Sequence, residues 1–238
     1  SVPEPGPLPA AAGRSEWDAE MIVARALEVG RVAVEATGRA SEIAAVGVTG
    51  QQHGMLLTEE GPGGEWRPVT PFIGWLDRRA DEPLGGFPSA IAWLHQRAGE
   101  EALARTGCRV ASGFMGATLF WLARAGALPS PPARASFLAD YFVARLCAQG
   151  PGTDPTNAAG SGIFDVAGRR WDPDLPVALD LPAEVLPAVR PTGAIVGALA
   201  GGAAAALGLP VGVPVMNALG DNQASFFGSV GSSSDDLL

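Results

Sequence analysis

The sequence predicts an α/β fold in which strands and helices share one buried core. Two apolar runs of strand length, residues 43–49 and 213–219, each lead into a polar segment. Stretches with helical spacing of apolar residues lie between them. Hydrophobic residues make up 47% of the 238 residues and charged residues only 17%, a balance typical of a chain with a sizeable core.

The charge balance excludes several kinds of partner and chemistry. A net charge of -9 argues against binding to nucleic acid or to an anionic membrane surface. All 16 basic residues are arginine. The chain therefore has neither the lysine of a Walker-type phosphate loop nor a lysine for Schiff-base chemistry.

Cysteine usage and hydropathy point to the cytoplasm. Cys108 and Cys147 show no spacing that indicates a zinc site or a disulfide framework, which agrees with a reducing compartment. Charges or prolines interrupt every apolar run before it reaches the length of a membrane span. The segment 1–13 has neither a basic region nor an apolar signal-peptide core.

The first elements are a helix and three strands. Ser15 and Asp18 form a capping-box pattern for a helix over 16–36, with an apolar stripe that includes Trp17 and Met21, and Gly38 ends it. Strands follow at 43–49, 55–58 and 71–75. The first is expected to be buried on both faces. The first and third end in polar residues, at 50–54 and 76–79.

The middle of the chain is expected to be mostly helical. Helices are predicted over 90–105, 117–124 and 135–147, and the proline segment 129–132 separates the last two. A loop and short strand (153–165), a proline-rich connector (173–191), a helix (198–207), a strand (213–219) and a helix (223–230) complete the chain.

Asp221 and His53 are the polar residues whose positions first indicate a ligand site. Asp221 stands where a strand ends and a helix begins, the usual position of a ligand crevice in open α/β sheets. It can equally be the helix N-cap. His53 lies in a loop between glycines and either contacts a ligand or bonds to backbone. His95, within a helical stretch, is interpreted as structural.

Three further residues have simpler interpretations beside a functional one. Trp75 is most simply a core residue, although its place at a strand end allows one ring face to contact a sugar. Asp77, beside two arginines, is most simply part of a solvated charge cluster. Asp154 can be an Asx-turn residue.

Taken together and in order, these segments resemble the FGGY family of carbohydrate kinases, of the xylulokinase and sedoheptulokinase kind. The matching segments are Thr49-Gly50-Gln51-Gln52-His53-Gly54, Trp75-Leu76-Asp77-Arg78-Arg79, Ala117–Leu122, Asp140-Tyr141, Thr153–Gly160 and Gly220-Asp221-Asn222-Gln223-Ala224. They span nearly the whole chain, from about Glu16 to Val230. Six segments in one order are far more specific than any single one.

The resemblance implies an actin-like, ribonuclease-H-like domain with a mixed sheet flanked by helices. It implies ATP and Mg²⁺ as the phosphate donor and its ion, and a ketose as the substrate. Asp221 would be the general base. Substrate binding would fall to Gln52, His53, Trp75, Asp77, Asp154 and Asn222. The sequence identifies no residue that binds the nucleotide and no metal ligand.

The sequence departs from the family pattern at both ends. No Asp-x-Gly-Thr strand opens it, and no glycine-rich phosphate segment follows Asp221. We therefore expect a flexible segment at 1–14, a partial sugar-binding domain at 15–219 and the start of an ATP-binding domain at 220–238. An unpaired sheet edge or an open apolar groove is expected as well. The chain alone is expected to be inactive.

The sequence leaves more than one substrate and more than one function open. D-xylulose is the first choice and sedoheptulose the second, both ahead of glycerol. A non-catalytic sugar-binding module and a fragment of a split or degenerate kinase are the alternative functions. Whether the protein forms a homodimer is left open.

Overall fold

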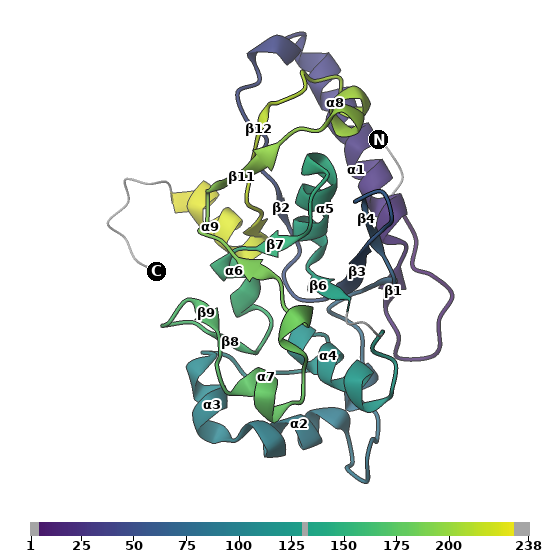
Figure 1. Cartoon of the computed structure of the whole chain (residues 1–238), viewed down its shortest axis with the longest axis vertical. Helices are drawn as coiled ribbons and strands as arrows, with labels where there is room; N and C mark the ends of the chain where they lie inside the picture. Colours follow the sequence, from purple (N-terminus) through teal and green to yellow (C-terminus); the bar gives the residue numbers. More distant parts are fainter. Residues whose placement is uncertain (1–4, 130–132, 231–238) are drawn as a thin grey trace.

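The computed structural model describes residues 5–129 and 133–230, and Figure 1 labels its elements. The helices are α1 (Ala19–Thr37), α2 (Ala90–Ala98), α3 (Glu100–Arg105), α4 (Met115–Arg124), α5 (Leu138–Cys147), α6 (Pro155–Ala159), α7 (Leu175–Ala178), α8 (Gly201–Leu207) and α9 (Asp221–Val230). The strands are β1 (Glu16–Trp17), β2 (Thr49–Gly50), β3 (Leu56–Glu60), β4 (Trp66–Pro68), β5 (Phe72–Ile73), β6 (Arg134–Ser136), β7 (Gly152–Thr153), β8 (Phe164–Asp165), β9 (Arg170–Trp171), β10 (Ala188–Val189), β11 (Ile195–Ala198), β12 (Pro214–Met216) and β13 (Leu219–Gly220).

The strands pair in both directions, as expected for a mixed sheet. β3 lies between β4 and β6 and is antiparallel to both, and β1 pairs antiparallel with β5. β2 runs parallel to β13, and β7 runs parallel to β10. The two parallel pairs join segments far apart in the chain, and one of them carries the candidate site.

Three apolar clusters hold the molecule together along its long axis. α1 and α8 lie at one end, and α2, α3 and α7 lie at the other, with the strands and α5 between them (Figure 1). The largest cluster joins α2 and α4 to β3 and includes the fully buried Leu57, Leu94 and Phe120. A second joins α5, α8 and β12, and a third packs α1 on β3 and β5.

The start and the buried face of the first helix differ from the prediction. Asp18 is the N-cap of α1 and accepts a hydrogen bond from the Met21 backbone N–H at 3.0 Å. Residues 16–17 form β1 instead. Ala19 and Val23 are buried, whereas Met21 is 48% exposed. Because residues 16–17 pair with β5, the helix begins at Ala19 and not at residue 16. The predicted apolar stripe is wrong at Met21. Gly38 ends the helix in the left-handed conformation, as predicted.

The predicted strand over 43–49 is extended but is not buried on both faces. Within the described residues its pairing is a bridge from Val46 to Val215, followed by β2 with β13. Ala44, Ala45 and Gly47 are exposed, whereas Val46 is half-buried. A small apolar groove of about 140 Å³, lined by α1, α5 and β2, lies beside this segment.

Three further predicted helices are shorter than expected, and some predictions extend beyond the described residues. Ala198 belongs to β11, so the helix predicted from 198 begins at Gly201. Gly99, with φ +74°, separates α2 from α3 within the predicted helix 90–105. Residues 134–136 pair with β3 as β6, so the helix predicted from 135 begins at Leu138. Residues 130–132 of the predicted proline separator, and parts of the predicted segments 1–14 and 220–238, lie outside the described part of the chain.

Candidate active site

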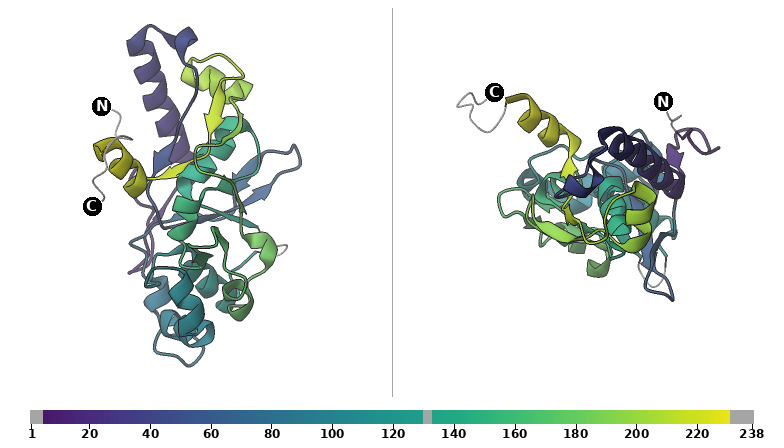
Figure 2. Two further views of the ribbon diagram at one scale, coloured as in Figure 1. Left: turned by 90° about the vertical axis from the view of Figure 1, so that its left-hand side faces the viewer. Right: turned by 90° about the horizontal axis from the view of Figure 1, so that it is seen from above.

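Two parallel strands bring the polar loops of the candidate site together. Leu219 pairs with Thr49 and Gly220 with Gly50, in the register of β13 and β2. Parallel neighbours end at the same edge of a sheet, so the residues that follow both strands meet there. Figure 2 shows α9 leaving this edge, away from the body of the molecule. The loop at 51–54 and the first turn of α9 are therefore neighbours.

A cleft of about 600 Å³ lies at this edge, a size typical of small-molecule sites. The structure brings five of the seven predicted site residues into its lining and leaves Asp77 and Asp154 outside it. The lining consists of Gln51, Gln52, His53, Trp75, Phe114, Asp221 and Asn222.

Asp221 is held by two backbone hydrogen bonds, and side-chain hydrogen bonds join the residues that donate them. Its Oδ1 accepts from the Gln52 N–H at 3.2 Å and from the Asn222 N–H at 2.9 Å. The Asn222 amide donates to Gln52 Oε1 at 2.9 Å, and Gln52 Nε2 donates to the Thr156 carbonyl at 2.7 Å. No hydrogen bond from the described residues engages Asp221 Oδ2. One carboxylate oxygen is thus fixed and the other is available to a ligand.

Asp221 also begins a helix. It is the first residue of α9, whose first backbone N–H groups have no partner within the helix. Its bonds reach the loop at Gln52 as well as the next residue of its own helix. Among the described residues Asp221 accepts no N-cap hydrogen bond from farther along α9, so its contacts favour the interpretation as a site carboxylate over that as a helix N-cap.

His53 presents one ring nitrogen to the cleft and uses the other to hold its place. Nδ1 lies 2.7 Å from the Gly160 carbonyl oxygen, and because a carbonyl only accepts, Nδ1 carries the proton. In the neutral ring Nε2 is then an acceptor. The ring stacks on Phe114 with centroids 4.2 Å apart. His53 thus bonds to backbone and lines the cleft at once, at a backbone φ of +62°.

Trp75 is 52% exposed, so its simplest interpretation as a core residue is wrong. Its backbone is wedged against Gly113, where a Cβ would lie 2.0 Å from the Trp75 carbonyl oxygen. This contact fixes the backbone of Trp75, whose side chain lines the cleft. Phe114, the next residue, was not predicted as a site residue, because an aromatic before a helix is more simply a core residue. The adjoining glycine is the signal that could have found it.

Asp77 braces the segment that carries Trp75. It is fully buried and accepts from Arg79 Nε at 2.7 Å and from the Ser15 N–H at 2.8 Å, so it is not part of a solvated cluster. Burial alone would raise the pKa of Asp77, but the hydrogen bonds from Arg79 and Ser15 hold it below its usual value. Its predicted part in substrate binding remains a prediction.

Asp154 contacts the site indirectly, through Thr156. It is fully buried and caps α6 by accepting from the Asn157 N–H at 2.9 Å. It also accepts from the hydroxyls of Thr156, at 2.8 Å, and Thr192, at 2.6 Å. Thr156 Oγ1 in turn accepts from the Gly220 N–H at 2.9 Å, one residue before the catalytic candidate. Direct contact of Asp154 with substrate remains a prediction.

A second buried carboxyl, Asp140, lies behind this network. The Asn157 amide is 3.4 Å from Asp140 Oδ1 and 3.4 Å from the Ala218 carbonyl oxygen. Burial raises the pKa of Asp140 well above its usual value, and the charge of Asp154 acts in the same direction. The carboxyl of Asp140 therefore keeps its proton more readily than an ordinary aspartate, and Asn157 connects it to Ala218, the residue before β13.

The described residues contain no group of three or more His, Cys, Asp and Glu side chains that could hold a metal ion. In that part of the chain, no helix is long and apolar enough to cross a membrane. We therefore assign no metal ligand here.

Comparison with known proteins identifies the family. The model of the N-terminal domain of the FGGY family of carbohydrate kinases matches residues 7–228. The chain belongs to this family. A glycerol kinase of Methylibium petroleiphilum is 30% identical to this FGGY domain over 223 residues, which cover 90% of this chain and 40% of that protein. The sedoheptulokinase of Homo sapiens is 30% identical over 206 residues, which cover 82% of this chain and 40% of that protein.

Solved structures confirm the predicted actin-like α/β fold of the FGGY domain. Xylulose kinase from Rhodospirillum rubrum superposes with a TM-score of 0.79 at 26% identity, covering 97% of this chain and 45% of that one. Plasmodium falciparum glycerol kinase with ADP gives a TM-score of 0.77 at 17% identity, covering 94% and 44%, and shows the fold alone. The chain spans about two fifths of the length of the two curated relatives above.

Proposed function

We propose that this chain is the sugar-binding part of an ATP-dependent carbohydrate kinase, with Asp221 as the general base. The observation that carries the proposal is the arrangement of Asp221, Gln52 and Asn222 around one end of a cleft with an exposed tryptophan. Hydroxyl groups of a sugar need several convergent donors and acceptors, and an indole face suits the C–H face of the sugar ring or chain.

The proposed step needs little from the protein beyond position and charge. A substrate hydroxyl would donate a hydrogen bond to the free Oδ2 of Asp221 and pass its proton there as its oxygen attacks the γ-phosphorus. A new O–P bond forms, the bond to the bridging oxygen breaks, and ADP leaves. His53 Nε2 would accept a hydrogen bond from a neighbouring hydroxyl.

The substrate, the nucleotide and the domain boundaries are further parts of the proposal. D-xylulose is the first choice and sedoheptulose the second. Relatives include enzymes named for glycerol, sedoheptulose and xylulose, so all three belong in the test. ATP with Mg²⁺ is the expected donor, and we assign neither of them a ligand in this chain. We divide the chain into a sugar-binding domain over 15–219 and the start of a second domain from 220, in a cytoplasmic protein.

The test measures binding and turnover separately. Calorimetry with D-xylulose, sedoheptulose and glycerol should show saturable binding of at least one of them to this chain. ATP-dependent phosphorylation of the same panel is measured for this chain and for the complete product of its gene, which we expect to be active. Sugar binding without turnover by the complete product would favour the non-catalytic sugar-binding module. Neither binding nor turnover would refute the proposal.

A further inference from the structure

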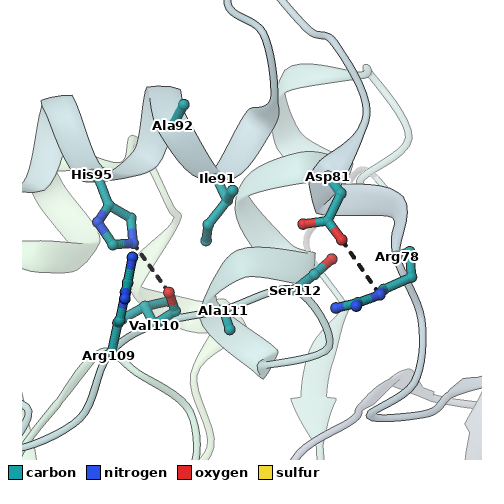
Figure 3. Close-up of a pocket in the computed structure, with 9 residues that line it drawn as sticks. All are labelled: Arg78, Asp81, Ile91, Ala92, His95, Arg109, Val110, Ala111 and Ser112. Carbon is teal, nitrogen blue, oxygen red and sulfur yellow. Dashed lines mark hydrogen bonds and ion pairs between the residues drawn. The ribbon is translucent and has the colours of Figure 1, made fainter.

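A second cavity, of about 450 Å³, shares its walls with the candidate active site (Figure 3). The segment that begins at Trp75 contributes that residue to the cleft and Arg78 to the cavity. The segment that ends at Phe114 contributes that residue to the cleft and Arg109 to the cavity. The cavity shares no lining residue with the proposed sugar site, although the same two segments line both.

Positive charge gathers at this cavity in a chain whose net charge is -9. Arg78 and Arg109 both line it, against the single carboxylate of Asp81. Arg78 meets Asp81 at 3.5 Å, and both side chains are largely exposed, so this pair is weak and leaves Arg78 available. Arg109 has no carboxylate within 4 Å among the described residues. Figure 3 shows Arg109 extending toward the ring of His95.

The floor of the cavity holds a buried hydroxyl group without a partner. Ser112 is 7% exposed, and its Oγ makes no hydrogen bond with the described residues. Such a group costs free energy unless a partner reaches it. His95 Nε2 lies 3.0 Å from the Val110 carbonyl oxygen and holds the segment that carries Arg109 and Ser112. In Figure 3 the Ser112 side chain lies between Ala111 and the Arg78–Asp81 pair.

We propose that this cavity binds the phosphate group of a small phosphate monoester. Arginine forks match phosphate oxygens with charge-assisted hydrogen bonds, and a serine hydroxyl adds a neutral donor. The apolar walls of Ile91 and Val110 offer contact to an organic part, which the volume accommodates and which inorganic phosphate lacks. The proposal does not depend on the kinase activity, because the site is outside the sugar cleft.

Calorimetry with this chain at fixed ionic strength tests the proposal, with ethyl phosphate and inorganic phosphate as the probes. Both should bind saturably, and the monoester should bind more tightly. Arg109→Gln should weaken the binding of ethyl phosphate about tenfold or more, and Ser112→Ala should weaken it severalfold without a change of charge. Arg39→Gln is the matched control, because it removes the same charge from a residue that pairs with Glu42 outside the cavity.

Three results would overturn the assignment. The first is the absence of saturable binding of either probe to the unaltered chain. The second is equal weakening by Arg109→Gln and Arg39→Gln, which would reduce the effect to general charge. The third is equal affinity for ethyl phosphate and inorganic phosphate, which would make the site one for the free ion. Far-ultraviolet circular dichroism of each variant confirms that it is folded before its binding is compared.

Discussion

The backbone N–H of Gln52 donates a hydrogen bond to the carboxylate of Asp221 at 3.2 Å, although 169 positions separate the two residues in the chain. The contact exists because β2 and β13 are parallel neighbours and both end at this point. The side-chain amide of Gln52 makes two further hydrogen bonds. Its Oε1 accepts from the Asn222 side chain, and its Nε2 donates to the Thr156 carbonyl. Gln52 therefore connects the loop after β2, the start of α9 and the start of α6.

Substitution of Gln52 should loosen this junction. In Gln52→Ala the buried Gln52 side chain is lost, and with it the hydrogen bonds to the exposed Asn222 amide and to the carbonyl of the half-buried Thr156. We expect the free energy of unfolding to fall by about 1–3 kcal/mol. Gln51→Ala is the control, because the buried Gln51 Nε2 has no hydrogen-bond partner among the described residues and its loss should cost little. Urea unfolding compares the two, and equal losses would contradict the role given to Gln52.

Gly220 should not tolerate a side chain. A Cβ there would lie 2.7 Å from Gln52 Nε2 and 2.8 Å from the two carbons before it. Because hydrogen bonds hold that amide at both ends, Gly220→Ala should displace it and destabilise the fold by about 1–3 kcal/mol. A Cβ at Gly202, in α8, meets nothing within 4 Å. There the same change should stabilise the protein by about 0.5–1 kcal/mol. Thermal and urea unfolding of both variants would show whether the signs differ.

The buried pair of Asp77 and Arg79 should matter far more than an exposed pair. Asp77→Asn leaves the buried guanidinium of Arg79 with Glu16 as its remaining charge partner and removes the fully buried one, which costs up to about 3–5 kcal/mol. The exposed pair of Arg67 and Glu59 is the control, and Glu59→Gln should leave stability close to that of the unaltered chain. Acid should act in the same direction as Asp77→Asn. Because the pKa of Asp77 is lowered by folding, its contribution is present above the ordinary aspartate pKa and is lost as pH falls below it.

Asp140 should give the opposite dependence on pH. Between the ordinary aspartate pKa of about 4 and the raised pKa of Asp140, the unfolded chain has lost this proton while the folded chain keeps it. Stability therefore falls as pH rises through that window, by up to about 1.4 kcal/mol per pH unit. Asp140→Asn, which resembles the neutral acid in shape, should remove this slope. Urea unfolding from about pH 4.5 to 7.5 measures the difference between the two proteins, and parallel curves would show that Asp140 does not titrate in this way.

The sequence allows the edge of the site to be predicted more fully than its walls. The loops at Gln52 and Asp221 follow apolar runs, and strand ends in such folds meet at one edge, so their proximity could be inferred. The exposure of Trp75 and the burial of Asp77 could not, because each depends on a distant segment. The backbone of Trp75 packs against Gly113, and the Ser15 N–H donates to the buried carboxylate of Asp77. The strands β1 and β6 could not be predicted for the same reason. Each forms by pairing with a distant segment, at residues whose local pattern predicted helix.

Asp221→Asn separates the two roles that the structure combines in this residue. An asparagine keeps an oxygen that can accept from the N–H groups of Gln52 and Asn222, so stability and sugar binding should stay close to those of the unaltered protein. It lacks the basicity that the proposed proton transfer requires. In the complete gene product we therefore expect turnover to fall by about 10²–10⁴-fold with little change in sugar affinity. Phosphorylation assays and calorimetry on the same preparation measure both quantities. Turnover near that of the unaltered protein would exclude Asp221 as the base, whereas a large loss of stability would show that its structural bonds dominate.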